Sequence, residues 1–92
     1  MDHLYTRSGR VLQRFGADLF TRSGRYVGHL HNGKVFDPAG RYSGTLVGDR
    51  IVYRTIDSAA TSAPATADDR PASTLANHTG SSVWGREPNF AD

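Results

Sequence analysis

The segment LYTRSGR at residues 4–10 returns as LFTRSGR at residues 19–25 and, with changes, as VFDPAGR at residues 35–41. The glycines near the ends of these copies follow one another at intervals of 15 and 16 residues. A fixed interval of this size indicates tandem copies of one small supersecondary unit, each of which buries its apolar face against its neighbours. The fold of the chain is therefore decided by what one copy forms and by how the copies pack.

Each copy is typical of a β-hairpin, because a short apolar segment precedes a glycine-containing turn and a second extended segment follows it. A glycine at a fixed turn position predicts a positive φ there. The second segments, at residues 11–15, 26–31 and 42–47, alternate in side-chain character with the period of a strand. Asn32-Gly33 is a strong hairpin signal between units, and Gly48-Asp49 lies at the matching place one unit later.

The fourth unit is incomplete, since residues 50–54 repeat the first strand but residues 55–58 offer neither a Gly-Arg turn nor a second strand. We predict an all-β fold of tandem β-hairpin repeats in a small pseudo-four-fold ring, an antiparallel meander with about seven strands by Arg54. The simplest closure pairs the last strand with the first. The alternative is an open edge that another chain fills. Gly28 and Gly44, inside strands, predict the close approach of a neighbouring backbone or side chain.

The composition changes at residue 58. Residues 1–57 form the predicted β-hairpin repeat domain, whereas residues 58–67 consist of Ala, Ser, Thr and Pro and cannot bury enough apolar surface to offset ordering entropy. Residues 58–92 are therefore predicted to be an extended C-terminal tail that is flexible or docked on a partner. Trp84 and Phe90 place two aromatic side chains near the end of this tether, which favours anchoring on a partner or back on the domain itself.

Charge is divided between the two parts of the chain. Residues 1–54 contain nine Lys and Arg against four Asp, a net charge of +5, and residues 55–92 contain two Arg against five Asp and Glu, a net charge of −3. Arginines at repeated turn positions would form a circle on one rim of the ring, where they could hold phosphate, nucleic-acid backbone or an acidic protein surface. The alternative is that they fold over aromatic rings of the following strands in cation–π contacts. These arginines are Arg7, Arg10, Arg22, Arg25 and Arg41.

The residues that enzymes use are poorly represented. The chain has no cysteine, which excludes disulfides and thiolate metal sites. No Ser, His and Asp are spaced as a nucleophilic set, and the Gly-Arg turns lack the pattern of a phosphate-binding loop. His29 and His31 share one face of a predicted strand, but a metal site needs three or four ligands. We therefore expect no metal, no cofactor and no enzymatic activity.

No apolar run approaches the roughly 18 to 20 residues of a membrane span, and no signal peptide is visible. We therefore expect no membrane association and a cytoplasmic location.

The repeated Leu-Tyr/Phe-x-x-x-Gly-Arg-x-x-Gly pattern over residues 3–56 resembles the bacterial four-fold β-flower domain, in which short hairpin repeats surround a pseudo-four-fold axis. The tail lies outside this resemblance. The resemblance implies a fold and no catalytic residues, because the family has no established activity. Tyr26-Val27-Gly28 and Tyr42-Ser43-Gly44 are also similar to the Tyr-x-Gly step of membrane-occupation (MORN) repeats, which are longer.

We therefore expect a non-enzymatic protein-interaction module, such as a small accessory subunit of a larger complex, fastened through its C-terminal tail. The residues expected to bind the partner are Trp84 and Phe90 in the tail and Tyr26 and Tyr42 on the repeat domain. The alternative is a module that binds nucleic acid or another polyanion through the arginine-rich rim. The oligomeric state is open, and association with another chain would support a core that a repeat block of about 50 residues fills only marginally.

Overall fold

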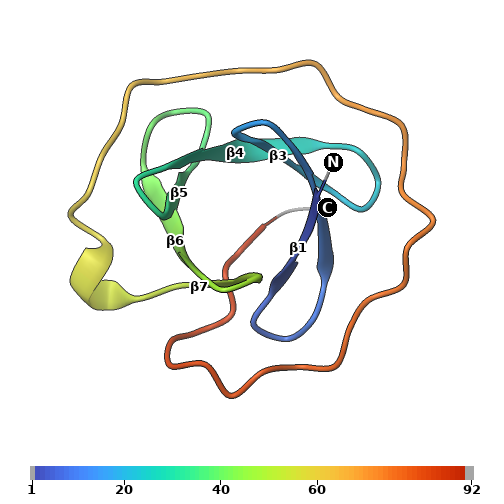
Figure 1. Cartoon of the computed structure of the whole chain (residues 1–92). Coiled ribbons are helices and arrows are strands. Elements are labelled where there is room, and N and C mark those ends of the chain that lie inside the picture. The colour runs from blue at the N-terminus through green and yellow to red at the C-terminus, as the bar shows by residue number, and fades with distance from the viewer. Residues whose placement is uncertain (1, 91–92) are drawn as a thin grey trace.

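The computed structural model describes residues 2–90. Its strands follow one another in chain order around a closed barrel, which Figure 1 shows as a ring. The predicted all-β meander of tandem hairpin repeats is confirmed. Within the described range the elements are strands β1 (Asp2–Thr6), β2 (Val11–Phe15), β3 (Asp18–Thr21), β4 (Tyr26–His31), β5 (Lys34–Phe36), β6 (Tyr42–Val47) and β7 (Arg50–Val52), followed by the short 3-10 helix η1 (Thr55–Asp57).

The barrel is closed by β1 and β7, which pair in parallel, whereas consecutive strands pair antiparallel. Parallel closure follows from the incomplete fourth unit. Successive strands of a meander alternate in direction, so an odd number of them leaves the first and last running the same way. The prediction that the last strand closes on the first is confirmed. Their pairing is short, with Tyr5 opposite Arg50 and Thr6 opposite Ile51.

The Gly-Arg turns of the three copies share one geometry. Their glycines have φ values between 89° and 101°, as the fixed turn position predicted. In each turn the glycine N–H donates to the backbone oxygen of the residue three positions earlier, at 2.8 to 2.9 Å. That earlier residue also accepts, through its side-chain oxygen, the N–H of the arginine. The sets are Thr6 with Gly9 and Arg10, Thr21 with Gly24 and Arg25, and Asp37 with Gly40 and Arg41.

The core of the barrel is built from one repeat position. An aliphatic side chain from the first strand of each unit is at most 5% exposed, and Leu12 and Val27 from the second strands pack against this layer. Phe90, from the far end of the tail, belongs to the same cluster and is 7% exposed. The core therefore draws on both parts of the chain. The aliphatic layer consists of Leu4, Leu19, Val35 and Ile51.

The glycines inside strands lie where the barrel is tightest. A Cβ at Gly28 would lie 2.1 Å from the backbone oxygen of Phe36, and one at Gly44 would lie 2.6 Å from Cγ2 of Ile51. Both predicted kinds of close approach, to a backbone and to a side chain, are therefore present.

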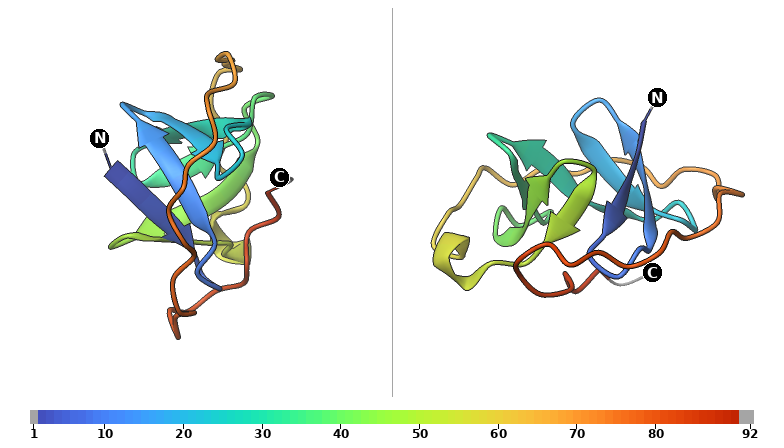
Figure 2. Two further views of the ribbon diagram at one scale, coloured as in Figure 1. Left: turned by 90° about the vertical axis from the view of Figure 1, so that its right-hand side faces the viewer. Right: turned by 60° about the horizontal axis from the view of Figure 1, so that its bottom comes forward.

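After residue 58 the chain runs along the outside of the barrel and makes a circuit of it, and its last part then turns toward the middle of the ring (Figures 1 and 2). There Phe90 joins the core cluster. We call residues 61–90 the belt. It passes the turn at residues 37–41 first, then the turn at 21–25, then the turn at 6–10, in the order opposite to the hairpins. For the tail we expected a flexible segment, docking on a partner, or anchoring back on the domain itself, and the structure places the belt against its own domain. The division at residue 58 stays a prediction, because residues on both sides of it build one core.

Replacing Leu19 by Ala should lower the free energy of unfolding by about 2–5 kcal/mol, because the side chain is fully buried in the aliphatic layer and its removal leaves a cavity. Leu75→Ala is the control, since Leu75 is 41% exposed on the belt and its replacement should change stability by less than about 0.5 kcal/mol. Urea unfolding followed by circular dichroism measures both. Equal losses in the two variants would contradict the described core.

Candidate interaction site

A groove of about 430 Å³ opens beside the C-terminal ends of β1 and β7, where the barrel closes. A complete fourth unit would have its second strand at this place. Instead, the belt passes here, and Arg86 exchanges two backbone hydrogen bonds of 2.8 Å with Tyr53. We call this the seam groove and define it by Arg7, Arg54, Ile56, Trp84 and Arg86, which all line it.

Large apolar side chains lie exposed in the seam groove. Trp84 is 60% exposed and Ile56 is 78% exposed. The guanidinium carbon of Arg54 lies 4.9 Å from the centre of the Trp84 ring, and Nε of Arg54 donates to the Trp84 backbone oxygen at 3.1 Å. Trp84 is therefore held in position by a cation–π contact while much of its ring remains accessible. Adjacent exposed apolar groups within a groove are a feature of interaction sites.

The groove is also positively charged. Nε of Arg7 donates to the backbone oxygen of Val83 at 2.8 Å, and a terminal nitrogen of Arg86 donates to Oγ1 of Thr55 at 3.2 Å. Neither these two arginines nor Arg54 forms an ion pair within residues 2–90, where the pair that the structure describes joins Arg50 and Asp49. A guanidinium has five N–H donors, so each groove arginine keeps donors for a further acceptor.

The nearby carboxylate of Glu87 is engaged elsewhere. It accepts the backbone N–H of Ser8 at 2.8 Å, the hydroxyl of Ser8 at 2.7 Å and the hydroxyl of Thr6 at 2.7 Å. Glu87 thus attaches the belt to the turn at residues 6–10, and within residues 2–90 it forms no ion pair with the groove arginines. The result is a belt segment, attached through Arg86 and Glu87, that presents Trp84 next to arginines without an ion pair among residues 2–90.

The structure separates the residues that the sequence predicted as partner-binding. Trp84 is exposed, Tyr26 is half-buried, and Tyr42 and Phe90 are buried. The hydroxyl of Tyr42 contacts Oγ1 of Thr45 and accepts the backbone N–H of Arg54 at 3.0 Å, so Tyr42 positions one wall of the seam groove from beneath. Phe90 fills the barrel and presents no anchor at the surface.

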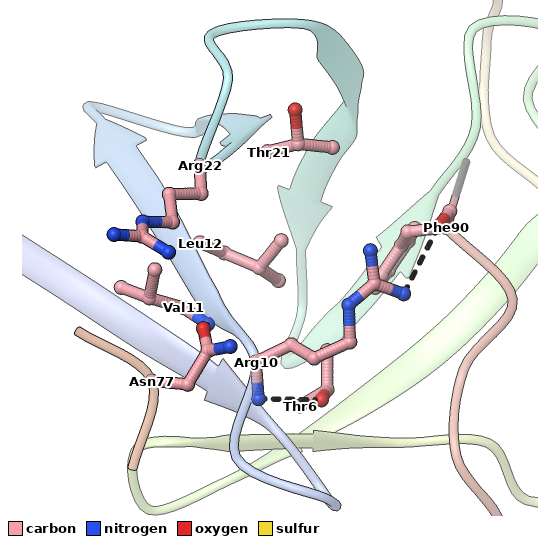
Figure 3. A pocket seen from close by; sticks show the side chains of 8 residues that line it. All are labelled: Thr6, Arg10, Val11, Leu12, Thr21, Arg22, Asn77 and Phe90. Carbon is pink, nitrogen blue, oxygen red and sulfur yellow. Dashed lines mark hydrogen bonds between the residues drawn. The ribbon is translucent and has the colours of Figure 1, made fainter. Parts of the chain in front are cut away.

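The predicted arginine rim is only partly exposed. Arg22, Arg25 and Arg41 are exposed, while Arg7 and Arg10 are half-buried. Arg10 and Arg22 line a second, smaller cavity of about 80 Å³ beneath the belt, where Arg10 donates to the backbone oxygen of Phe90 at 3.4 Å (Figure 3). This volume suits a few water molecules and is far below that of a usual small-molecule site.

The cation–π contacts that the structure describes involve other arginines than those of the predicted rim. They are Arg50 over Tyr5, Arg54 over Trp84, and Arg70 over Phe15 and Phe20.

Sequence reasoning missed Arg54, Ile56 and Arg86. A signal for the first two was present in the failure of the fourth repeat, because side chains that follow β7 have no second strand to cover them. Arg86 carries no such signal, since its place depends on how far the belt travels around the barrel.

Other kinds of site find little support in the described residues. No group of three His, Cys, Asp or Glu within residues 2–90 is close enough to hold a metal ion, and Nε2 of His29 instead hydrogen-bonds Oγ of Ser62 at 3.1 Å. No helix in this range has the length and apolarity to cross a membrane. No family model, curated protein or solved structure matches the chain. What the chain binds must therefore be inferred from its own residues.

Tyr26, whose ring lies 5.6 Å from that of Phe20, gives a test of the packing on the outside of the barrel. Its hydroxyl is buried without a hydrogen-bond partner among the described residues, and burial, together with the charge of Asp18, raises the pKa of Tyr26 above its ordinary value. The folded state then keeps this proton when the unfolded chain loses it, so the free energy of unfolding should fall as the pH rises above about 10. Tyr26→Phe should remove this part of the decline and leave stability at pH 7 unchanged or slightly higher.

Tyr42→Phe is the matched control, because the Tyr42 hydroxyl has hydrogen-bond partners and its loss should cost about 1 kcal/mol at pH 7. Urea unfolding between pH 7 and pH 11 measures both variants. A pH dependence of Tyr26→Phe identical to that of the unmodified chain would show that Tyr26 titrates normally.

Proposed function

We propose that this chain is a non-enzymatic protein-interaction module of the β-flower type, such as a small accessory subunit, and that its partner binds in the seam groove. The observation that carries the proposal is the pair of exposed side chains, Trp84 and Ile56, beside guanidiniums that have no carboxylate partner within residues 2–90. Tryptophan and arginine are the residues most often found to dominate the binding energy of protein interfaces.

The chemistry of the groove selects an acidic segment that carries an apolar side chain. Arg7, Arg54 and Arg86 supply positive charge and further N–H donors. A guanidinium can bind a carboxylate through two parallel hydrogen bonds. Trp84 and Ile56 supply the apolar surface that would be removed from water. The groove volume of about 430 Å³ suits one or two side chains of an extended segment.

The attachment of the belt favours tight binding at this groove. Glu87 fixes the belt to the turn at residues 6–10, and the backbone pairing of Arg86 with Tyr53 fixes it to the end of β7. Trp84 therefore loses little conformational freedom when a partner binds, which reduces the entropic cost of association. The tail contributes to binding in this proposal as part of the folded surface and not as a loose tether.

The exposed Arg22, Arg25 and Arg41 support a second candidate, which is the binding of nucleic acid or another polyanion at the end of the barrel that carries the Gly-Arg turns. The two candidates use different arginines. Binding of a polyanion depends steeply on salt and does not need Trp84.

A library of random peptides displayed on phage and selected against the immobilised chain tests the first candidate. Selected peptides should be rich in Asp and Glu around one Leu, Ile or aromatic residue. Trp84→Ala should weaken their binding by about 2–4 kcal/mol, because it removes the central apolar contact. Leu75→Ala, which removes an exposed apolar side chain elsewhere on the belt, should leave binding unchanged. Fluorescence anisotropy with the synthetic peptides measures both.

Two results would overturn the assignment to the seam groove. One is a set of selected peptides that bind Trp84→Ala as tightly as the unmodified chain. The other is the absence of selected acidic peptides together with retention on heparin that is lost in a variant with Arg22, Arg25 and Arg41 replaced by Ser. The second result would assign the binding activity to the rim.

A further inference from the structure

The belt contacts the barrel in a pattern that recurs every eight residues. At each contact a belt N–H donates to the backbone oxygen of a turn glycine, and the N–H three residues later donates to the backbone oxygen two residues before that glycine. These hydrogen bonds measure 2.7 to 3.1 Å. The belt pairs and their acceptors are Ser62 and Ala65 on Gly40 and Pro38, Arg70 and Ser73 on Gly24 and Arg22, and His78 and Ser81 on Gly9 and Arg7.

The same interval continues beyond the last complete turn. Arg86 lies eight residues after His78, and it is the residue that pairs with Tyr53 at the end of β7. Tyr53 occupies the repeat position of Thr6 and Thr21. The belt therefore contacts the fourth unit after the same interval of eight residues, but at the position of Thr6 and Thr21 and not at that of the turn glycines.

The turn glycines are shaped for this contact. A Cβ at Gly9, Gly24 or Gly40 would lie 1.6 to 2.1 Å from a belt backbone oxygen, closer than any side chain permits. Gly16 and Gly48, in the turns at the other end of the barrel, also have positive φ, but a Cβ there meets nothing within 4 Å. Turn geometry alone thus explains Gly16 and Gly48. The glycines of the Gly-Arg turns also leave room for the belt backbone.

Side chains of the belt add a second layer to the pattern. At two of the three contacts, the residue before the contact accepts, through a side-chain oxygen, the first N–H of the following strand: Asp69 from Tyr26 at 3.0 Å and Asn77 from Val11 at 2.9 Å. At the same two contacts, the contact residue itself lies over an outward aromatic ring. His78 stacks on Tyr5 at 3.8 Å, and the guanidinium carbon of Arg70 lies 3.6 Å from the centre of the Phe15 ring.

We infer that the outside of the barrel is a circular peptide-binding track with an eight-residue step, and that the belt of a second copy of this chain binds it as the chain's own belt does. The track is formed by the turns at residues 6–11, 21–26 and 37–42. The track holds the belt mainly through backbone hydrogen bonds. Residues 58–60, which connect the barrel to the belt, form none of these bonds. The same contacts therefore form whichever molecule supplies the belt, which is the condition for exchange of an element between copies.

A second observation favours exchange over a barrel that functions alone. Phe90 of the belt is part of the core cluster, and the belt covers Tyr5 and Phe20, which are at most 9% exposed. When the belt dissociates, the barrel exposes this apolar surface, and only the belt of another copy can cover it in the same way. A short connection gives the chain's own belt an effective concentration in the millimolar range, so the closed single copy dominates when the protein is dilute.

The track is tested by cutting the connection in the folded full chain. A protease site replaces residues 58–60, the purified protein is cleaved, and a fluorescent peptide of residues 58–92 is added. The peptide should bind saturably and be displaced by an excess of the unlabelled peptide. Inserting one Ala between Ala67 and Asp68 shifts the later contacts out of register and should weaken binding at least tenfold. Inserting the same Ala before Thr61 keeps the register and should not.

Failure of the matched peptide to bind, even after it is unfolded and refolded together with the cleaved protein, would overturn the track. Equal binding of the two insertion peptides would overturn the eight-residue step. For the intact chain, refolding at millimolar concentration should yield a dimer fraction detectable by light scattering. A single copy at every concentration would overturn exchange with a second copy. None of these outcomes involves the seam groove peptides, so they are independent of the proposed function.

Gly24→Ala and Gly48→Ala form a matched pair in the uncleaved chain, because both positions have positive φ and only Gly24 touches the belt. Hydrogen exchange should show at least a tenfold loss of protection at the amides of Arg70 and Ser73 in Gly24→Ala and no comparable loss there in Gly48→Ala. Equal behaviour of these amides in the two variants would mean that the turn glycines serve the turns alone.

Discussion

The structure depends on the absence of a side chain at Gly9, Gly24 and Gly40. Each glycine allows the positive φ that joins two strands, and each leaves space for a backbone oxygen of the belt where a Cβ would collide. The two parts of the chain therefore meet through hydrogen bonds between their backbones, at equivalent places around the ring. From these contacts follow the course of the belt, the covering of the outward aromatic rings and the entry of Phe90 into the core.

This arrangement solves a problem of size. A barrel of about 50 residues encloses a core too small to offset the entropy of folding comfortably. The belt supplies a second layer outside the strands, where His78 lies on Tyr5 and Arg70 lies over Phe20, so that both rings are buried although they point away from the axis. Composition alone suggested that residues 58–67 gain little by becoming ordered, and their side chains indeed contribute little burial. Their backbone groups contribute instead, because the N–H groups of Ser62 and Ala65 donate to the backbone oxygens of Gly40 and Pro38.

The repeat domain could be predicted from the sequence because its information is local. Recurrent Gly-Arg turns, alternating strands and a missing last strand were enough to predict the hairpins, their order and the closure of β7 on β1. The belt could not be predicted from the sequence. Ser62, Arg70 and His78 make the same backbone contact with a turn glycine, but their side chains are chemically different, so no sequence pattern marks them. Trp84 was predicted as a binding residue and is exposed, but the burial of Phe90 depends on the length of the whole circuit, which no short pattern records.

The seam groove exists because the hairpin repeat ends before the belt does. The hairpin repeat stops after β7, whereas the belt continues to Arg86, eight residues beyond its last contact with a turn glycine. A complete fourth hairpin would place a turn under the belt and cover the side chains that follow β7. In its absence the belt is held there by its pairing with Tyr53 and by the attachment of Glu87 to Thr6 and Ser8. Trp84 and Ile56 are therefore left exposed in the seam groove, and the proposed partner site lies where the repeat of the ring is interrupted.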